Sequence, residues 1–117
     1  CSNHQPHDLE CKDLEFDKAD FGVISSQTMF SALVEAYPND LETIVEAIST
    51  RPRSVFNLAA SGINTNAIAN LTLFDPSINW EFNQNSNASL SNNSSFIDKT
   101  MKGQVIGIFN KSKNSIN

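Results

Sequence analysis

The sequence has 117 residues, the length of one small domain, but only 39% of them are hydrophobic, against the ~45–50% of an ordinary globular chain. Its net charge is −5 at pH 7 and it has no cluster of lysine or arginine, which excludes a nucleic-acid-binding domain, because such a domain needs basic patches to neutralise phosphates. No apolar run approaches the ~18 residues of a membrane-spanning helix, so we expect no membrane partner. Two cysteines, Cys1 and Cys11, are too few for a disulfide framework and indicate free thiols in a cytoplasmic protein.

Residues 8–25 are acidic and irregular, and Gly22 is available for a turn that needs positive φ. From Ser26 the apolar residues recur at helical spacing and predict three short helices. The first should end at Pro38, and its apolar stripe comprises Met29, Phe30, Leu33, Val34 and Tyr37.

A capping box of Asn39 and Glu42 is expected to begin the second helix. Its apolar face comprises Leu41, Ile44, Val45 and Ile48. Thr50 should cap the third helix, which has Pro52 in its first turn. The apolar residues expected to dock this helix on the other two are Val55, Phe56 and Leu58.

After Gly62 the alternation of apolar and polar residues predicts three strands. They cover 71–74, 78–82 and 105–109, with a turn at 75–77 between the first two and with Trp80 in the core. Residues 83–95 have no core content and are expected to form a long loop or to be locally disordered. Residues 111–117 should fray. Three such strands leave exposed edges that need partners.

Residues 1–28 contain a specific series of motifs. It consists of Asn3-His4-Gln5-Pro6-His7, Glu10-Cys11-Lys12-Asp13, Phe21-Gly22 and Gln27-Thr28. This series resembles the last barrel strand and following loop of the dihydroorotases, which usually have D-H-A-P-H, then E-x-K, a Pro/Phe-Gly turn and G-L-E-T.

The resemblance continues in two later blocks that are typical of amidohydrolases in general. Residues 51–58 are similar to the family's N-P-A-x-x-F-G-L helix, and residues 69–76 are similar to its A-D-L-x-L-x-D-P strand. It covers nearly the whole chain but only the last quarter or so of a complete family member. Because the sequence also opens on Cys1 and not on Met, we expect a C-terminal fragment of a longer polypeptide.

The resemblance implies an α/β fold. Residues 1–62 would be the end of a TIM-like (β/α)8 metal-dependent hydrolase barrel, comprising the rim of the last strand, the substrate loop and three C-terminal helices. Residues 63–117 would be strands of a small composite β domain, which strands from the N-terminus of the protein complete.

The resemblance also assigns roles to individual residues. Asn3 stands where the family has an Asp that touches the metal centre and serves as general base and acid; a carboxamide cannot do this, because it does not ionise near neutral pH. His7 corresponds to the histidine that binds the substrate carboxylate, although a solvent-exposed loop histidine is the simpler alternative. Phe21 and Gly22 match the turn whose backbone contacts the substrate ring.

Further positions depart from the family or have simpler explanations. Ser25 and Ser26 replace Gly-Leu, and Gln27 replaces Glu, although Gln27 could equally be a helix-capping residue. His4 and His7 form an H-x-x-H pair, but a metal needs three or four ligands, so the other ligands are expected outside this chain. The acidic residues Asp17 and Asp20 are expected on a solvated face.

Two functions follow from the resemblance. The first is a dihydroorotase-like cyclic amide hydrolase that interconverts carbamoyl-aspartate and dihydroorotate with zinc, in the cytoplasm, with a homo-oligomer as one possible assembly. The alternative is a non-catalytic dihydroorotase paralogue that assembles with aspartate carbamoyltransferase. A hydantoinase is a weaker third option, because the His-Gln-Pro-His and Phe-Gly pattern speaks against it.

Overall fold

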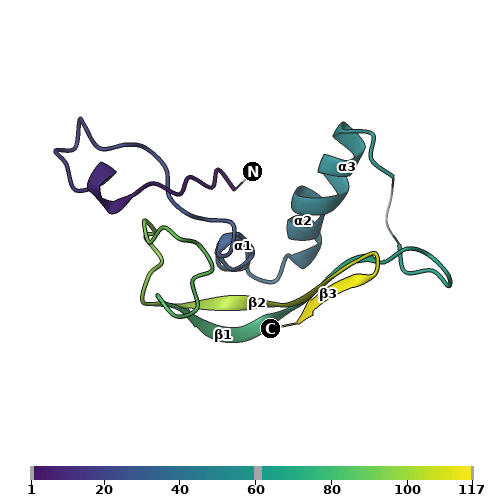
Figure 1. Ribbon diagram of the computed structural model, residues 1–117. Coiled ribbons are helices and arrows are strands. Elements are labelled where there is room, and N and C mark those ends of the chain that lie inside the picture. The colour runs from purple at the N-terminus through teal and green to yellow at the C-terminus, as the bar shows by residue number, and fades with distance from the viewer. Residues whose placement is uncertain (1, 60–61, 117) are drawn as a thin grey trace.

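The computed structural model describes residues 2–59 and 62–116, and it is built from one antiparallel sheet with helices on one side (Figure 1). The sheet has the order β1 (Asn70–Phe82), β2 (Lys99–Asn110), β3 (Lys113–Ile116). The helical elements are the 3-10 turn η1 (Leu9–Cys11), α1 (Met29–Ala36), α2 (Leu41–Val45), the π-helical turn η2 (Glu46–Thr50) and α3 (Arg51–Val55). The chain is therefore an α/β structure, as the sequence predicts.

Helix α1 lies against β2. The apolar stripe predicted for this helix is confirmed on the side that meets the sheet. Phe30 and Val34 are buried, whereas Tyr37, the residue that follows the last turn, is 51% exposed. Ser31 is also buried, because its hydroxyl donates to the carbonyl of Gly103 on β2 at 2.5 Å. The sheet thus receives an apolar face and one specific polar contact.

The second and third predicted helices form one continuous helical run, α2–η2–α3. Asp40, not Asn39, caps its start, since the Asp40 carboxylate accepts from the Thr43 amide at 3.2 Å. Thr50 has helical backbone angles and its side chain caps nothing, so the predicted break there is wrong. A π-helical turn precedes Pro52, whose ring and missing N–H are incompatible with a regular helical interior.

The apolar residues at the end of this run do not dock on the other helices as predicted. Their exposed fractions are 75% for Val55, 72% for Phe56 and 58% for Leu58. They form an apolar surface that no described residue covers.

The predicted turn at 75–77 does not interrupt the sheet, because β1 is one long strand from Asn70 to Phe82. Its pairing with β2 shifts register between Leu73 and Phe74 and again between Asp75 and Asn79, and Asp75 accepts from the Ser77 amide at 2.7 Å within the second irregularity. The polar tail also differs from the prediction: it forms β3, paired antiparallel with β2, and does not fray over residues 113–116.

The core consists of two small clusters that join the helices to the sheet. One contains Ile24, Phe82 and Met101, and the other contains Phe30, Val34 and Ile44. Trp80 packs against the first cluster, as predicted, and its indole N–H donates to the Gly103 carbonyl at 2.9 Å.

The shape is open for a chain of this length. Its radius of gyration is 16.3 Å, whereas a compact 117-residue domain has about 13 Å. Its accessible surface is 8808 Å², whereas a folded monomer of 12.9 kDa exposes about 6,300 Å². The described part of the chain therefore leaves much more surface uncovered than a self-contained domain does.

Gly103 is the point at which α1 and β2 come closest, and it offers a test of this packing. Its φ is +89°, and a Cβ there would lie 3.0 Å from Val34 Cγ2 and 3.3 Å from Phe30 Cε1. We expect Gly103→Ala to destabilise the fold by about 1–3 kcal/mol and to lower the thermal unfolding midpoint by several degrees. Gly62→Ala, at an exposed site with no such φ, should leave the midpoint unchanged. Equal midpoints for the two variants would contradict the close packing.

Candidate functional site

Two segments far apart in the predicted motif series lie side by side at the N-terminal end of the structure. Residues 3–7, called the rim, run parallel to residues 21–26, called the return segment. The pairing consists of a parallel bridge between His4 and Val23 and a hydrogen bond from the Gln5 amide to the Val23 carbonyl at 3.0 Å. The rim therefore carries Asn3 and His7 on one irregular segment, with a single β-bridge, beside the Phe21-Gly22 turn.

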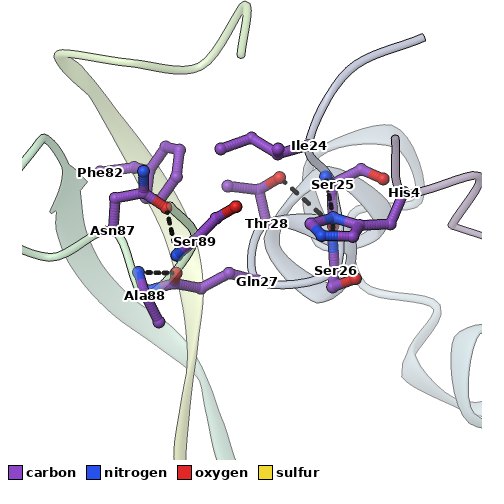
Figure 2. A pocket seen from close by; sticks show the side chains of 10 residues that line it. All are labelled: His4, Ile24, Ser25, Ser26, Gln27, Thr28, Phe82, Asn87, Ala88 and Ser89. Carbon is purple, nitrogen blue, oxygen red and sulfur yellow. Dashed lines mark hydrogen bonds between the residues drawn. The ribbon is translucent and has the colours of Figure 1, made fainter. Parts of the chain in front are cut away.

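His4 joins the rim to the end of the return segment, just before α1 (Figure 2). Its Nδ1 accepts from the Ser25 amide at 3.1 Å and from the Ser26 amide at 3.3 Å. Because both partners are donors, Nδ1 carries no proton in this arrangement and the ring proton lies on Nε2. His4 is thus a structural residue of the rim, and the serines that depart from the family's Gly-Leu supply its partners.

Gln5 connects the two predicted site residues of the rim. Its Nε2 lies 3.5 Å from Asn3 Oδ1, and its Oε1 lies 3.4 Å from His7 Nε2. The structure therefore brings Asn3 and His7 together through one intervening carboxamide. Asn3 itself is exposed and has a φ of +48°.

Gly22 of the return segment lies directly against the Gln5 side chain. Its φ is +99°, as the predicted turn requires, and a Cβ there would lie 2.0 Å from Gln5 Oε1 and 2.8 Å from Gln5 Cβ. Only glycine allows this approach without displacing the Gln5 side chain. Phe21 is 89% exposed, so its ring contributes nothing to the packing of the turn.

His7 is half-buried and has an acceptor near each ring nitrogen. Its side chain is 32% exposed, and Nδ1 lies 3.7 Å from the Asp20 carboxylate while Nε2 faces Gln5. It lines a hollow together with Asp8, Leu9, Glu10, Leu90, Ser91 and Asn92. Each ring nitrogen therefore faces a protein acceptor, at a distance longer than that of a normal hydrogen bond.

Several known proteins with sequences similar to this chain are dihydroorotases. The chain is 33% identical over 108 residues to the dihydroorotase of Wolbachia sp. subsp. Brugia malayi, an alignment that covers 90% of this chain and 24% of that protein. It is 35% identical over 105 residues to the dihydroorotase of Geotalea daltonii, covering 87% of this chain and 25% of that protein. The chain is a relative of the dihydroorotases. It spans about a quarter of the length of these proteins. No protein-family profile matches it.

In this dihydroorotase relative, a lysine holds the loop between the rim and the return segment, residues 8–20, in place. Lys12, in the block similar to the family's E-x-K, donates from Nζ to the Asp20 carbonyl and to the Gly22 carbonyl, the latter at 2.7 Å. Asp20 is exposed, as expected, and its carboxylate also lies 3.7 Å from His7 Nδ1. Asp17 is exposed, as expected.

Gln27 neither caps α1 nor faces the rim. The residue at the N-cap is Thr28, and the carboxamide of Gln27 binds the backbone of the polar residues that follow β1: it donates to the Ser86 carbonyl at 2.5 Å and accepts from the Ala88 amide at 2.9 Å. The capping explanation of Gln27 is therefore wrong. Figure 2 shows the side chains around the hollow along this contact, which has a volume of about 190 Å³ and is lined by His4, Phe82 and Ser89 among others.

In residues 2–59 and 62–116, no three side chains of His, Cys, Asp or Glu gather where they could bind a metal ion. His4 and His7 line different hollows, so the H-x-x-H spacing does not bring the two rings to one point. A metal site made by the described residues alone does not fit this arrangement. Within the same ranges, no helix has the length and apolarity to cross a membrane.

The polar stretch after β1, residues 83–95, showed no apolar pattern in the sequence, but two of its residues bind the rim. Ser91 and Asn93 are buried, at 9% and 7% exposed, and both bind backbone atoms near the rim. Hydrophobic periodicity cannot reveal such residues, because their contacts are hydrogen bonds to distant carbonyls.

The two hydrogen bonds from Lys12 are expected to keep the loop 8–20 folded against the return segment. Hydrogen bonds from charged donors contribute about 1.5–3 kcal/mol each, and partial exposure reduces this here. Lys12→Met should therefore raise the rate of chymotrypsin cleavage after Phe16 and Phe21 by about tenfold. Lys18→Met removes only the exposed pair with Glu15 and should leave the rate unchanged. Equal rates for the two variants would contradict the role of Lys12.

Proposed function

We propose that the whole protein is a dihydroorotase-type cyclic amide hydrolase of pyrimidine biosynthesis and that this chain supplies the part that binds the substrate carboxylate. The observation that supports it is the half-buried imidazole of His7, placed between Gln5 and Asp20 on a rim that a turn with Gly22 closes. Both contacts are long, 3.4 Å to Gln5 Oε1 and 3.7 Å to the Asp20 carboxylate, so a small acid would replace one of these acceptors and receive a charge-assisted hydrogen bond from the ring. The substrates we propose are dihydroorotate and carbamoyl-aspartate.

The backbone of Gly22 would contact the ring of this substrate through its N–H. The Gly22 carbonyl already accepts from Lys12 Nζ at 2.7 Å and lies 3.5 Å from Asn93 Nδ2, so both of its lone pairs are directed at protein donors. Phe21 lies beside it with an exposed ring, which is available to cover an apolar face of the ligand. Specificity for a small cyclic amide would come from this turn and from His7.

Asn3 gives the proposed reaction no general base. Its Oδ1 lies 3.5 Å from a donor of Gln5, which suits a neutral carboxamide oxygen. Zinc, when bound in the whole protein, would polarise the amide and activate water, and its ligands would lie outside this chain. The described residues would then bind and orient the substrate, while the proton transfer would be slow or would use another group.

The wider arrangement is also a proposal. Residues 1–62 would close a (β/α)8 barrel and residues 63–117 would join a composite β domain, in a cytoplasmic protein. The exposed apolar residues after α3 and the open shape of the chain support a role as part of a larger body.

A non-catalytic paralogue that assembles with aspartate carbamoyltransferase is the second candidate, and Asn3 favours it. The intact rim at His7 and Gly22 favours the enzyme. The upstream sequence separates the two, because an H-x-H pair on the first barrel strand and a metal-bridging lysine on the fourth would support catalysis.

Restoring a carboxylate at residue 3 tests the proposed chemistry directly. A positioned general base contributes about 10²–10⁴-fold to a rate, so Asn3→Asp in the full-length, zinc-loaded protein should raise kcat for dihydroorotate hydrolysis by that factor. Asn114→Asp, the same carboxamide-to-carboxylate change at an exposed site on β3, is the matched control and should change nothing.

Two results would count against this account. Equal rates for wild type and Asn3→Asp would show that residue 3 is not the position of the base. No turnover in either protein, with zinc bound, would favour the assembly partner.

A further inference from the structure

We propose that Asn93 is a positioning residue that sets the distance between the rim and the return segment and thereby places His7 and Gly22 for the ligand. Asn93 lies in the polar stretch after β1, which rises from the end of the β1–β2 hairpin toward the N-terminal segment (Figure 1). The effect on the substrate rests on the proposed function, whereas the effect on the two segments does not.

The carboxamide of Asn93 bridges the two segments. Its Nδ2 donates to the Gln5 carbonyl of the rim at 3.1 Å and lies 3.5 Å from the Gly22 carbonyl of the return segment. Both partners are acceptors, so the amide orientation follows from the contacts. Asn93 is only 7% exposed, and water cannot easily replace it.

The backbone of Asn93 continues the same contact. Its carbonyl accepts from the Ile24 amide at 3.1 Å, so the return segment is bound to residue 93 at two points, Gly22 and Ile24. Ile24 is itself buried at 3% in the cluster with Phe82 and Met101. Asn93 thus connects the end of the sheet to the return segment and, through its side chain, to the rim.

Ser91 completes the contact at His7. Its hydroxyl lies 2.5 Å from the His7 carbonyl and 2.7 Å from Asn93 Oδ1. A hydroxyl has one proton and can donate to one of these at a time. When the hydroxyl donates to the His7 carbonyl, residues 91 and 93 together bind backbone atoms of His7 and Gly22, the two positions that we assign to the ligand. When it donates to Asn93 Oδ1, it orients the carboxamide that binds Gln5 and Gly22.

This arrangement implies more than support of the local loop. Lys12 binds the Gly22 carbonyl from the loop 8–20, and the hydrogen bond between Gln5 and Val23 does not involve Asn93. Loss of the Asn93 side chain would therefore leave the two segments joined but free to shift relative to each other. Displacements of about 1 Å at a reacting centre can reduce rates 100-fold, so even a small shift would be measurable.

The experiment uses three variants of the full-length, zinc-loaded protein. Asn93→Ala removes the carboxamide, and Asn93→Asp keeps its shape but directs an oxygen at the two carbonyls. Asn85→Ala is the control, at an exposed position of the same polar stretch. We expect native-state trypsin cleavage after Lys12 and Lys18 to be about tenfold faster in both Asn93 variants, from the loss of about one hydrogen bond. We also expect the KM for dihydroorotate to rise about tenfold, with a smaller fall in kcat. The control should match wild type in both readouts.

The outcomes separate this proposal from the proposed function. If wild type does not hydrolyse dihydroorotate, the proposed function fails, and faster cleavage in the Asn93 variants alone then supports the positioning role. Cleavage at the wild-type rate in a folded variant, with KM unchanged, overturns it. If circular dichroism shows that both variants lose the sheet, Asn93 is a general stability residue and the proposal is also overturned.

Discussion

The close approach of Gly22 to Gln5 is the constraint on which the rest of the site depends. A side chain at residue 22 would overlap Gln5 Oε1, and Gln5 is the group between Asn3 and His7. The positive φ of Gly22 turns the chain so that the return segment can pair with the rim through Val23. One backbone conformation therefore determines both the parallel pairing and the position of the imidazole that we assign to substrate binding.

The polar stretch after β1, residues 83–95, connects the sheet to this turn. The buried ends of the hairpin strands, Phe82 and Met101, pack on Ile24 of the return segment. The Asn93 side chain then donates a hydrogen bond to the Gln5 carbonyl of the rim. The rim is an irregular segment with one β-bridge and few apolar contacts, and such a segment is stable only where a packed neighbour binds its backbone groups. Strands β1 and β2 thus act on the site through Ile24 and Asn93.

The sequence was most informative where apolar periodicity or a motif was present. The stripe of α1, the positive φ of Gly22 and the strand character of Trp80 follow from patterns that local physics dictates. The continuity of β1 through Asp75-Pro76-Ser77 could not be predicted, because a turn and a register shift within a strand use the same residue types. The docking of Asn93 was also unpredictable, since a buried carboxamide and a solvated one look alike in sequence, and its partner Gln5 lies 88 residues away.

We infer that the rim and its turn form the carboxylate-binding wall of a hydrolase, and a crystal structure of the full-length protein with dihydroorotate would decide this. We expect the ligand carboxylate to lie within hydrogen-bonding distance of the His7 ring and the ligand ring to face the Gly22 N–H. A ligand bound elsewhere, with His7 still between Gln5 and Asp20 and no carboxylate near it, would show that this wall does not bind the substrate.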